Sequence, residues 1–354
     1  TISLLCFRIA GIFMDKILTV IIPTYNMEEL LPRCLDSFLI KDKKLMQQVE
    51  VLVVNDGSKD NSSSIAHRYE KLYPHTFRVI DKENGNYGSC VNRGLQEATG
   101  KYVKVLDADD SFNIDVLEAY LKLLQSTDVD LVITSGTNVT PSDEVTFLWK
   151  FNYLIGEIYP IEELHHVWIH DVTHKTSLLK QMGYHQTEGI SYTDEEWVFY
   201  PIFHVKDFLA SDLRLYKYTV GREGQTMNPK NWAKSMKNEI LVSKGMYGYL
   251  NSVNWQCGRA QNYIEEKMNG RIAEFFQRAL LTCGLYDNQD LIEFDMYLKS
   301  NCLKVYDSLD DLTAPNDRFA FYYVRYWRSC NYELPALINK FKLYQLWQKL
   351  RRMK

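Results

Sequence analysis

Three carboxylates lie within four consecutive residues, Asp107, Ala108, Asp109 and Asp110. They directly follow residues 102–106, a run that is typical of a buried strand. At an effective dielectric near 20, two carboxylates about 4 Å apart repel one another by roughly 4 kcal/mol. Such a cluster is therefore favoured mainly where a hard divalent cation neutralises it. Because a cation that also needs phosphate oxygens implies a nucleotide, the cluster predicts a metal–nucleotide site.

The same acids allow two other interpretations. Six residues occupy the offsets of an EF-hand calcium loop: Asp107, Asp109, Ser111, Asn113, Asp115 and Glu118. That loop needs glycine at its sixth position, where this chain has Phe112, and it follows a helix rather than a strand. Alternatively, the acids cap a helix that begins near Ile114. The location at a strand end favours the metal–nucleotide site.

Two further polar loops follow strand-like runs. Asp56 comes just after residues 49–54, where its carboxylate could accept from a base N–H or a ribose hydroxyl, and Tyr25 on a neighbouring loop could stack on the base. A plain turn explains the Asp56 loop equally well. The loop from Asn84 to Gly94 is glycine-rich, but it is neither a phosphate-binding P-loop nor a dinucleotide fingerprint.

The elements that must position these loops alternate between strands and helices. Strands are predicted over residues 18–22, 49–54, 77–80, 102–106 and 131–134, and amphipathic helices over residues 28–38 and 62–73. This alternation predicts an α/β fold whose mostly parallel sheet is covered by helices on both faces. In such sheets ligands bind beyond the carboxyl ends of the strands, where the polar loops lie. After about residue 215 the pattern becomes helical, as in residues 232–250 and 263–281.

The composition excludes several classes of protein. The chain has 354 residues, of which 46% are hydrophobic and 24% charged, as in ordinary globular proteins. A net charge of -4 argues against a nucleic-acid partner, which usually requires a strongly basic surface. The seven cysteines have no paired spacing and are odd in number, which fits a reducing, cytoplasmic setting.

The two ends of the chain differ from the rest. Residues 1–13 are largely apolar and lack a signal-peptide cleavage site, whereas Met14 would be an ordinary start, so we expect a non-native or upstream leader there. The last fifteen residues interleave Lys and Arg with aromatic and Leu residues, as interfacial helices do. This basic tail either makes a peripheral contact with the inner face of the plasma membrane or docks on the protein itself.

Five segments together resemble the inverting nucleotide-sugar glycosyltransferases of family 2, which have the GT-A fold. They are Val-Ile-Ile-Pro-Thr-Tyr-Asn at 20–26, Val-Val-Asn-Asp-Gly-Ser-Lys-Asp at 53–60, the Asn-Gly and Asn-Arg-Gly elements of 84–94, Ala-Thr-Gly-Lys-Tyr at 98–102 and Leu-Asp-Ala-Asp-Asp at 106–110. The resemblance covers roughly residues 16–203. Five motifs in order, at plausible spacings, make it specific.

The resemblance assigns roles to the residues of these motifs. It implies a nucleotide site that comprises Pro23, Thr24, Tyr25, Asp56, Asn84, Asp107 and Ala108. Asp107 and Asp109 belong to an Asp-x-Asp element that meets ribose and metal, with Asp109 as the direct metal ligand. The implied cofactor is Mg²⁺ or Mn²⁺, which stabilises the charge on the departing nucleoside diphosphate.

An inverting transfer also needs a base that takes the proton of the attacking hydroxyl. The resemblance places this base at Asp194, in the segment Ser-Tyr-Thr-Asp-Glu-Glu-Trp of residues 191–197. Many relatives have an acid just before the base, whereas here Thr193 precedes Asp194, so Glu195 and Glu196 stay open as candidates. An acidic helix start without a catalytic role is the alternative.

Two other groups of residues are less specific. His165, His166, His170 and His174 have a poor spacing for zinc and are interpreted as acceptor-side or core residues. Arg222 could clamp diphosphate oxygens from a mobile lid, or it could belong to a plain turn between domains.

These features predict a metal-dependent inverting glycosyltransferase. Residues 14–215 would form the GT-A catalytic domain, and residues 216–354 a helical C-terminal region with the basic tail. We expect a UDP-sugar donor and a hydroxyl of a glycan or lipid-linked glycan as acceptor, and the resemblance implies bacterial cell-surface polysaccharide synthesis. A nucleotidyltransferase is the first alternative, although residues 23–26 lack its Gly-rich basic loop. A catalytically silent sugar-nucleotide-binding or scaffold protein is the second.

Overall fold

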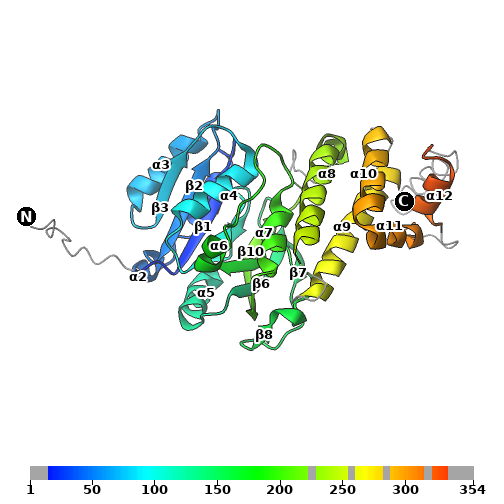
Figure 1. Ribbon diagram of the computed structural model, residues 1–354. Coiled ribbons are helices and arrows are strands. Elements are labelled where there is room, and N and C mark those ends of the chain that lie inside the picture. Colours follow the sequence, from blue (N-terminus) through cyan, green and yellow to red (C-terminus); the bar gives the residue numbers. More distant parts are fainter. Residues whose placement is uncertain (1–14, 222–228, 254–259, 282–287, 315–320, 334–354) are drawn as a thin grey trace, which may run out of the picture. The chain divides into compact units, whose positions relative to one another are not determined.

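The computed structural model describes residues 15–221, 229–253, 260–281, 288–314 and 321–333 (Figure 1). The chain divides into two compact units, one of residues 1–163 and 167–223 and the other of residues 164–166 and 224–354. The predicted leader, Arg222 and the basic tail lie outside the described residues. The predicted domain limit after residue 215 falls within strand β10 (Asp207–Thr219), which belongs to the first unit.

Within the described residues, the first unit is built on a ten-stranded sheet with the main order β3-β2-β1-β4-β9-β6-β10-β5. The first four strands are mutually parallel and coincide with predicted ones: β1 (Leu18–Thr24), β2 (Val49–Asn55), β3 (Phe77–Asp81) and β4 (Tyr102–Val105). Leu18 pairs with Val49 on one side and with Tyr102 on the other. The carboxyl ends of these strands therefore meet at one edge of the sheet, as predicted.

The rest of the sheet is mixed. β6 (Leu131–Val139) and β10 run parallel, whereas β9 (Val172–Lys175) is antiparallel to both β4 and β6. Three short antiparallel strands complete it: β5 (Ser111–Phe112), β7 (Val145–Trp149) and β8 (Ile158–Pro160). The sequence analysis missed β10, whose pairing with β6 shifts register between Ser211 and Tyr216 and so interrupts the simple alternation that predicts a strand.

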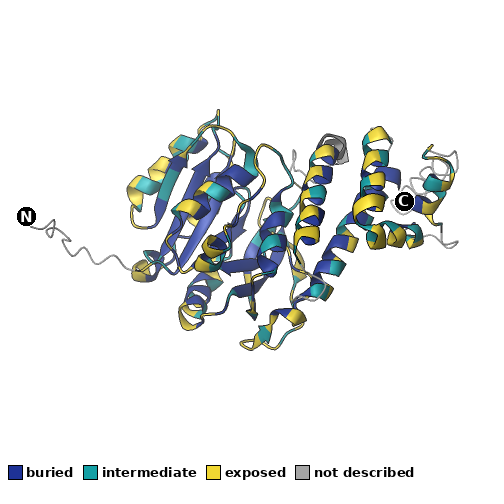
Figure 2. Cartoon of the chain, viewed as in Figure 1, coloured by how far each residue is buried: buried dark blue, intermediate teal, exposed yellow. Residues whose placement is uncertain are grey.

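Helices cover both faces of the parallel half of the sheet. α1 (Leu31–Asp36), α3 (Ser62–Leu72) and α5 (Ile114–Ser126) share one buried cluster with Val20 and Ile22 of β1. The opposite face receives α4 (Asn86–Glu97), where a Cβ on Gly94 would lie 2.5 Å from the side chain of Ile21. Figure 2 shows the strands buried and the outer sides of the helices exposed. The predicted α/β class is confirmed.

Three short elements and one longer helix complete the first unit: α2 (Lys43–Met46), η1 (Ile161–Glu163), α6 (Thr176–Gln181) and α7 (Asp194–Ile202). The helix predicted over residues 28–38 is shorter than expected. It begins at Leu31 with Pro32 in its first turn, a position that proline favours because its missing N–H would have no partner within the helix.

The second unit is helical, as predicted. Its elements are α8 (Pro229–Ser252), α9 (Gln261–Leu281), α10 (Asn288–Asn301), α11 (Leu303–Ser308), η3 (Leu309–Asp311) and α12 (Tyr323–Ser329). Ile264, Met268 and Ile272 repeat at helical spacing on α9 and are buried, so this helix presents one apolar face to its neighbours. Among the described helices, none combines the length and the apolar character needed to cross a bilayer.

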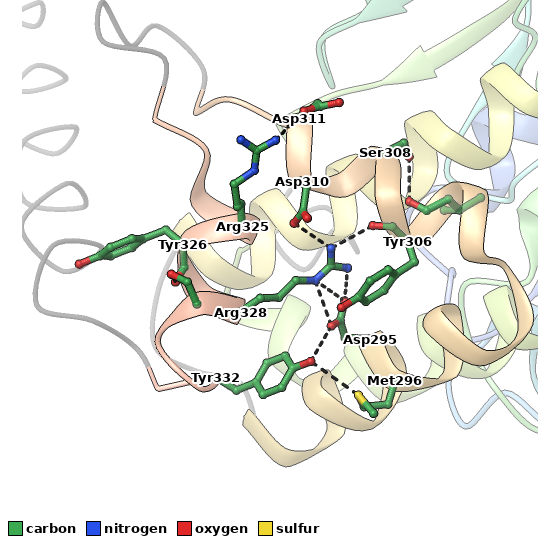
Figure 3. A network of polar contacts seen from close by, with 12 residues as sticks. Asp295, Met296, Tyr306, Ser308, Asp310, Asp311, Arg325, Tyr326, Arg328 and Tyr332 are labelled. Carbon is green, nitrogen blue, oxygen red and sulfur yellow. Dashed lines mark hydrogen bonds and ion pairs between the residues drawn. The ribbon is translucent and has the colours of Figure 1, made fainter.

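A buried ion-pair network joins the last helices of this unit (Figure 3). The Arg328 guanidinium donates to Asp295 from Nη2 at 2.5 Å and to Asp310 from Nη1 at 2.9 Å. It also lies 3.5 Å from the ring centroid of Tyr306. Asp295 is fully buried. Because burial opposes ionisation of Asp295, the charge is tolerated there only while Arg328 remains in place.

Arg328→Ala is therefore expected to destabilise the second unit by about 3–5 kcal/mol, since it leaves a buried carboxylate unpaired. Arg325→Ala is the matched control, because Arg325 lies on the same helix but pairs with Asp311 at the surface, at 2.8 Å. Exposed pairs of this kind are worth at most about 1 kcal/mol. Urea unfolding followed by tryptophan fluorescence, to which the buried Trp327 contributes, measures both losses. Equal losses in the two variants would contradict the prediction.

Candidate active site

The three carboxylates of the acidic cluster converge just after β4. Oxygen atoms of Asp107, Asp109 and Asp110 all lie within 4.8 Å of one another; the first two residues are half-buried and the third is buried. A set of carboxylate oxygens suits hard cations such as Mg²⁺ and Mn²⁺. The residues present therefore fit the divalent metal that the sequence analysis implied, and Asp107 and Asp109 are close enough to share it.

Contacts from distant parts of the chain hold this cluster in place. Asp110 accepts hydrogen bonds from the Tyr216 hydroxyl at 2.8 Å and from the Thr219 backbone N–H at 2.7 Å, so it anchors the loop to β10. The carbonyl of Asp109 accepts from the Arg33 guanidinium at 2.6 Å. The sequence analysis missed all three contacts, because nothing local in the sequence links residues so far apart.

The hydroxyl of Tyr87 donates to the Asp107 carboxylate at 2.9 Å. Tyr87 is in the first turn of α4, directly after Asn86, whose φ of 65° places it in the left-handed region that Asn tolerates. The contact orients one member of the cluster from the opposite side of the sheet edge. Tyr87 was not a predicted site residue, since the sequence analysis noted only the Asn-Gly and Asn-Arg-Gly elements of this loop.

The two alternative interpretations of the cluster are wrong. Asn113 is the N-cap of α5, and its side chain accepts from the backbone N–H of Asp115 at 3.2 Å, so the helix does not use the cluster as its cap. The preceding element is the strand β4, and Phe112 is buried, which excludes the EF-hand geometry.

The electrostatics of the cluster call for a counter-charge. Burial raises the pKa of Asp107 to about 7, and the charges of Asp109 and Asp194 add to the shift. Burial, followed by the charges of Asp109 and Asp107, also raises the pKa of Asp110. Full ionisation of the three carboxyls is therefore costly unless a cation is bound among them.

An open cavity of about 590 Å³ lies beyond the ends of β2 and β3. It is lined by Tyr25, Asn55, Gly57, Lys59, Asp81, Lys82, Glu83 and Asn84. Tyr25 is 46% exposed, so its ring is available for stacking, and the predicted residue Asn84 also lies in the wall. The structure thus brings two of the predicted nucleotide-binding residues together.

Asp56 is buried beside this cavity, between the wall residues Asn55 and Gly57. Its Oδ1 accepts from Lys82 Nζ at 2.6 Å and from the Gly85 N–H at 2.9 Å. The carboxylate is therefore partly neutralised and ties the loop after β3 to the loop after β2. Lys82 was missed in the sequence, although its position directly after a predicted strand could have marked it.

Three other predicted nucleotide-binding residues are buried and bring mainly their backbone to the site. Pro23 and Thr24 are the last two residues of β1, and the Thr24 carbonyl accepts from the Asp56 N–H at 2.8 Å. Ala108 is buried within the acidic cluster. Arg222, the remaining predicted contact, lies outside the described residues.

Asp194 is the first residue of α7 and is half-buried. Its charge contributes to the raised pKa of Asp107 and, after burial and Asp107, to the raised pKa of Tyr87. The structure thus places Asp194 within electrostatic reach of the acidic cluster. Glu196 is committed elsewhere, because its carboxylate accepts from both the N–H and the hydroxyl of Thr187, at 2.7 and 2.8 Å.

The loop that leads to Asp194 is fastened to α4. Gln186 is fully buried, and its Nε2 donates to the carbonyl of Thr193 at 2.8 Å, just before α7 begins. Its backbone N–H donates to Asn92 on α4 at 2.8 Å. A Cβ on Gly88 would lie 2.0 Å from the carbonyl oxygen of Thr187, so α4 and this loop approach closely. These contacts make the start of α7 rigid.

Two of the predicted histidines differ in environment. His174 is fully buried, its Nε2 is 3.1 Å from the Trp197 carbonyl oxygen, and burial lowers its pKa to about 3, so it is a neutral core residue. His170 is half-buried and its ring lies 4.9 Å from that of Tyr216, the residue that binds Asp110. His170 is therefore next to the acidic cluster.

Comparison with known proteins agrees with this geometry. Residues 19–182 match the family model described as glycosyl transferase family 2. The glycosyltransferase GlyA of Streptococcus pneumoniae is 27% identical over 67% of this chain and 31% of its own length. The glycosyltransferase GlyG of the same species is 30% identical over 43% of this chain and 48% of its own length. The chain thus spans about a third to a half of these relatives.

The solved structures that resemble this chain include the 1–349 fragment of TarS from S. aureus. The structural alignment covers 96% of this chain and 92% of the fragment, with a TM-score of 0.58 and 18% sequence identity. At this identity the likeness concerns the fold. The fold and the acidic cluster define a GT-A protein, the class that the motifs implied. Residues 19–182 form a domain of glycosyl transferase family 2.

Proposed function

We propose that this protein is a metal-dependent inverting glycosyltransferase that moves a sugar from a nucleotide diphosphate to a hydroxyl group. The observation that carries the proposal is the placement of Asp194 at the rigid start of α7, within electrostatic reach of the acidic cluster. A carboxylate cluster that suits a divalent cation, next to a separate carboxylate, provides both components of a single displacement. The match of residues 19–182 to glycosyl transferase family 2 supports the same reaction.

Each residue has a role in this mechanism. Tyr25 stacks on the base of the nucleotide, and Asp56, fixed by Lys82, shapes the wall beside it. Asp109 and Asp107 hold the divalent cation, either Mg²⁺ or Mn²⁺. When bound, this cation offsets the negative charge that develops on the diphosphate. Asp194 accepts the proton of the attacking hydroxyl, on the side of the sugar opposite the leaving group.

The finer assignments follow from the motifs. We propose a UDP-sugar as donor and a glycan or lipid-linked glycan as acceptor, in bacterial cell-surface polysaccharide synthesis. The catalytic domain would begin at residue 14 and include the whole of β10, past the predicted limit at residue 215, and the helical region would follow it. The basic tail would hold a cytoplasmic protein at the inner face of the plasma membrane. Liposome flotation of the full chain and of a chain ending at residue 336 tests the last point, and equal flotation would refute it.

A thermal-shift panel tests the function. Nucleotide sugars are added to the full chain with Mn²⁺, and the cognate donor should raise the melting temperature, since about 100-fold saturation is worth roughly 2.7 kcal/mol. Slow release of UDP from that donor would separate an enzyme from a silent binding protein. No stabilisation by any nucleotide sugar would refute the proposal.

The affinity for Mn²⁺ is expected to fall by up to about tenfold per pH unit below pH 7, because a proton competes for Asp107, whose pKa is raised to about 7. An ordinary aspartate would give a flat response between pH 8 and pH 6, since its pKa is about 3.9. Calorimetric Mn²⁺ titrations at pH 8, 7 and 6 measure the effect. A flat response would contradict it.

The raised pKa of Asp107 also affects the stability of the metal-free fold, which should fall with rising pH whereas the affinity for Mn²⁺ rises. Without metal, the folded chain binds the Asp107 proton more tightly than the unfolded chain does, so this group's contribution to stability falls as the pH rises from about 4 to about 7. Bound Mn²⁺ should offset that loss. The stabilisation by Mn²⁺ in thermal melts should therefore be larger at pH 8 than at pH 6.

A further inference from the structure

A group of aromatic rings lies beside the acidic cluster and takes no part in the proposed donor site. We name Trp149, at the end of β7, His170, before β9, and Tyr218, on β10, the aromatic platform. The ring centroids of His170 and Tyr218 are 5.0 Å apart, and those of Trp149 and His170 are 6.3 Å apart. All three residues are half-exposed. The platform is therefore accessible, unlike the rings of the core.

The platform is held rigidly. Gly136 on β6 leaves room for the indole, because a Cβ there would lie 2.2 Å from Cζ2 of Trp149. Trp149 Nε1 donates to Asp171 at 2.7 Å. The buried Lys104, which lies three residues before Asp107 in the sequence, donates to the carbonyl of His170 at 2.6 Å. The strand that precedes the acidic cluster thus also fixes the backbone at His170, and such preorganisation favours binding.

Tyr216 and Tyr218 connect the platform to the acidic cluster. Tyr216 is buried, contacts the His170 ring and donates to Asp110. Burial, followed by the charges of Asp110, Asp107, Asp109 and Asp194, raises the pKa of Tyr218 to about 12. Its hydroxyl therefore stays protonated, near both the cluster and Asp194. Among the described residues it has no hydrogen-bond partner, so it can donate to a ligand.

We infer that the aromatic platform is the acceptor subsite and binds the ring of a neutral sugar. The apolar C–H face of a pyranose would pack on the rings, as apolar groups do on aromatic faces, and Tyr218 would donate to a ring hydroxyl. The four nearby carboxylates disfavour a sugar that carries phosphate or carboxylate at this position. This inference rests on the proposed function, and it adds that the acceptor of the proposed sugar transfer is a neutral sugar.

Saturation-transfer NMR on the full chain with UDP and Mg²⁺, the diamagnetic candidate cation, tests the inference. The probes are methyl β-D-glucopyranoside, methyl β-D-galactopyranoside and glucose 6-phosphate. Wild type should transfer saturation to the C–H protons of at least one neutral glycoside and less to the phosphate. Tyr218→Ala and Trp149→Ala should each lower that transfer by about fivefold or more, which is the scale of a lost aromatic contact.

Two variants serve as controls. Tyr218→Phe keeps the ring and should retain most of the saturation transfer, whereas Tyr322→Ala removes an exposed tyrosine of the second unit and should behave as wild type. Equal transfer in wild type and Tyr218→Ala, or no transfer to either glycoside, would overturn the inference. Calorimetry with UDP and Mn²⁺ on wild type and on each variant separates the acceptor subsite from the proposed function. No heat of binding in wild type would refute the proposed function, whatever the glycosides do.

Discussion

Asp194→Asn is expected to lower sugar transfer by roughly 100- to 10,000-fold, the usual contribution of a general base. Asparagine keeps the shape and the helix start but cannot accept a proton. Donor binding should change little, because Asp194 is outside the set of residues that would hold the nucleotide. Radiolabelled sugar transfer measures the first effect, and calorimetry with UDP and Mn²⁺ measures the second.

Glu195→Gln is the matched control for this variant, since it removes a neighbouring charge from the same helix turn and should leave transfer largely intact. Glu196→Gln is a poorer control, because Glu196 holds Thr187 by two hydrogen bonds and its replacement loosens the loop. Normal transfer by Asp194→Asn, together with loss in Glu195→Gln, would move the base to Glu195.

Asp109→Ala is expected to weaken metal-dependent UDP binding by more than about 100-fold, since even the outer partners of a metal ligand are worth roughly 10- to 100-fold. The variant should remain folded. The charge of Asp109 raises the pKa of both Asp107 and Asp110, so its removal relieves repulsion and should not lower the melting temperature of the metal-free protein.

Calorimetry with UDP in Mn²⁺ and in EDTA checks this second prediction. Asp115→Ala is the matched control: Asp115 is an exposed acid in the first turn of α5, only six residues away, and its backbone N–H still bonds to Asn113 in the variant. Wild-type binding by Asp109→Ala, or equal binding of UDP by wild type in Mn²⁺ and in EDTA, would show that the cluster holds no donor-linked cation.

Asp110 would be a misleading choice for the same experiment. It is buried and bonded to Tyr216 and Thr219, so its replacement would release the loop from β10 as well as remove a charge. The sequence shows three equivalent acids, whereas the structure shows that one of them has an anchoring role.

The predicted strands of the parallel half were correct because they are continuous apolar runs bounded by polar loops. The predicted meeting of those loops followed from the same pattern, because parallel strands end at one edge of the sheet. The short antiparallel strands and β10 were missed. β7 has no buried face to produce a hydrophobic signal, and β10 shifts register where its pattern would otherwise be read.

The site shows the same division. The sequence predicted Asp107, Asp109, Asp56 and Tyr25 as site residues from their positions after strands, and Asp194 through the resemblance. It missed Lys82, Tyr87 and Tyr216, which bond to Asp56, Asp107 and Asp110. These partners are ordinary residues in the sequence, and only their placement across the sheet edge makes them part of the site.

The sequence by itself determined the strand–helix alternation, the family motifs and the concentration of carboxylates after the fourth predicted strand. These features are local, and local spacing expresses them fully. Only the tertiary structure decided that Asp110 is the carboxylate anchored to β10, that Asn113 and none of the three acids caps α5, and which rings lie beside the cluster. Those outcomes depend on pairs such as Asp110 with Thr219, which are 109 residues apart and meet because β5, which follows Asp110, pairs with β10.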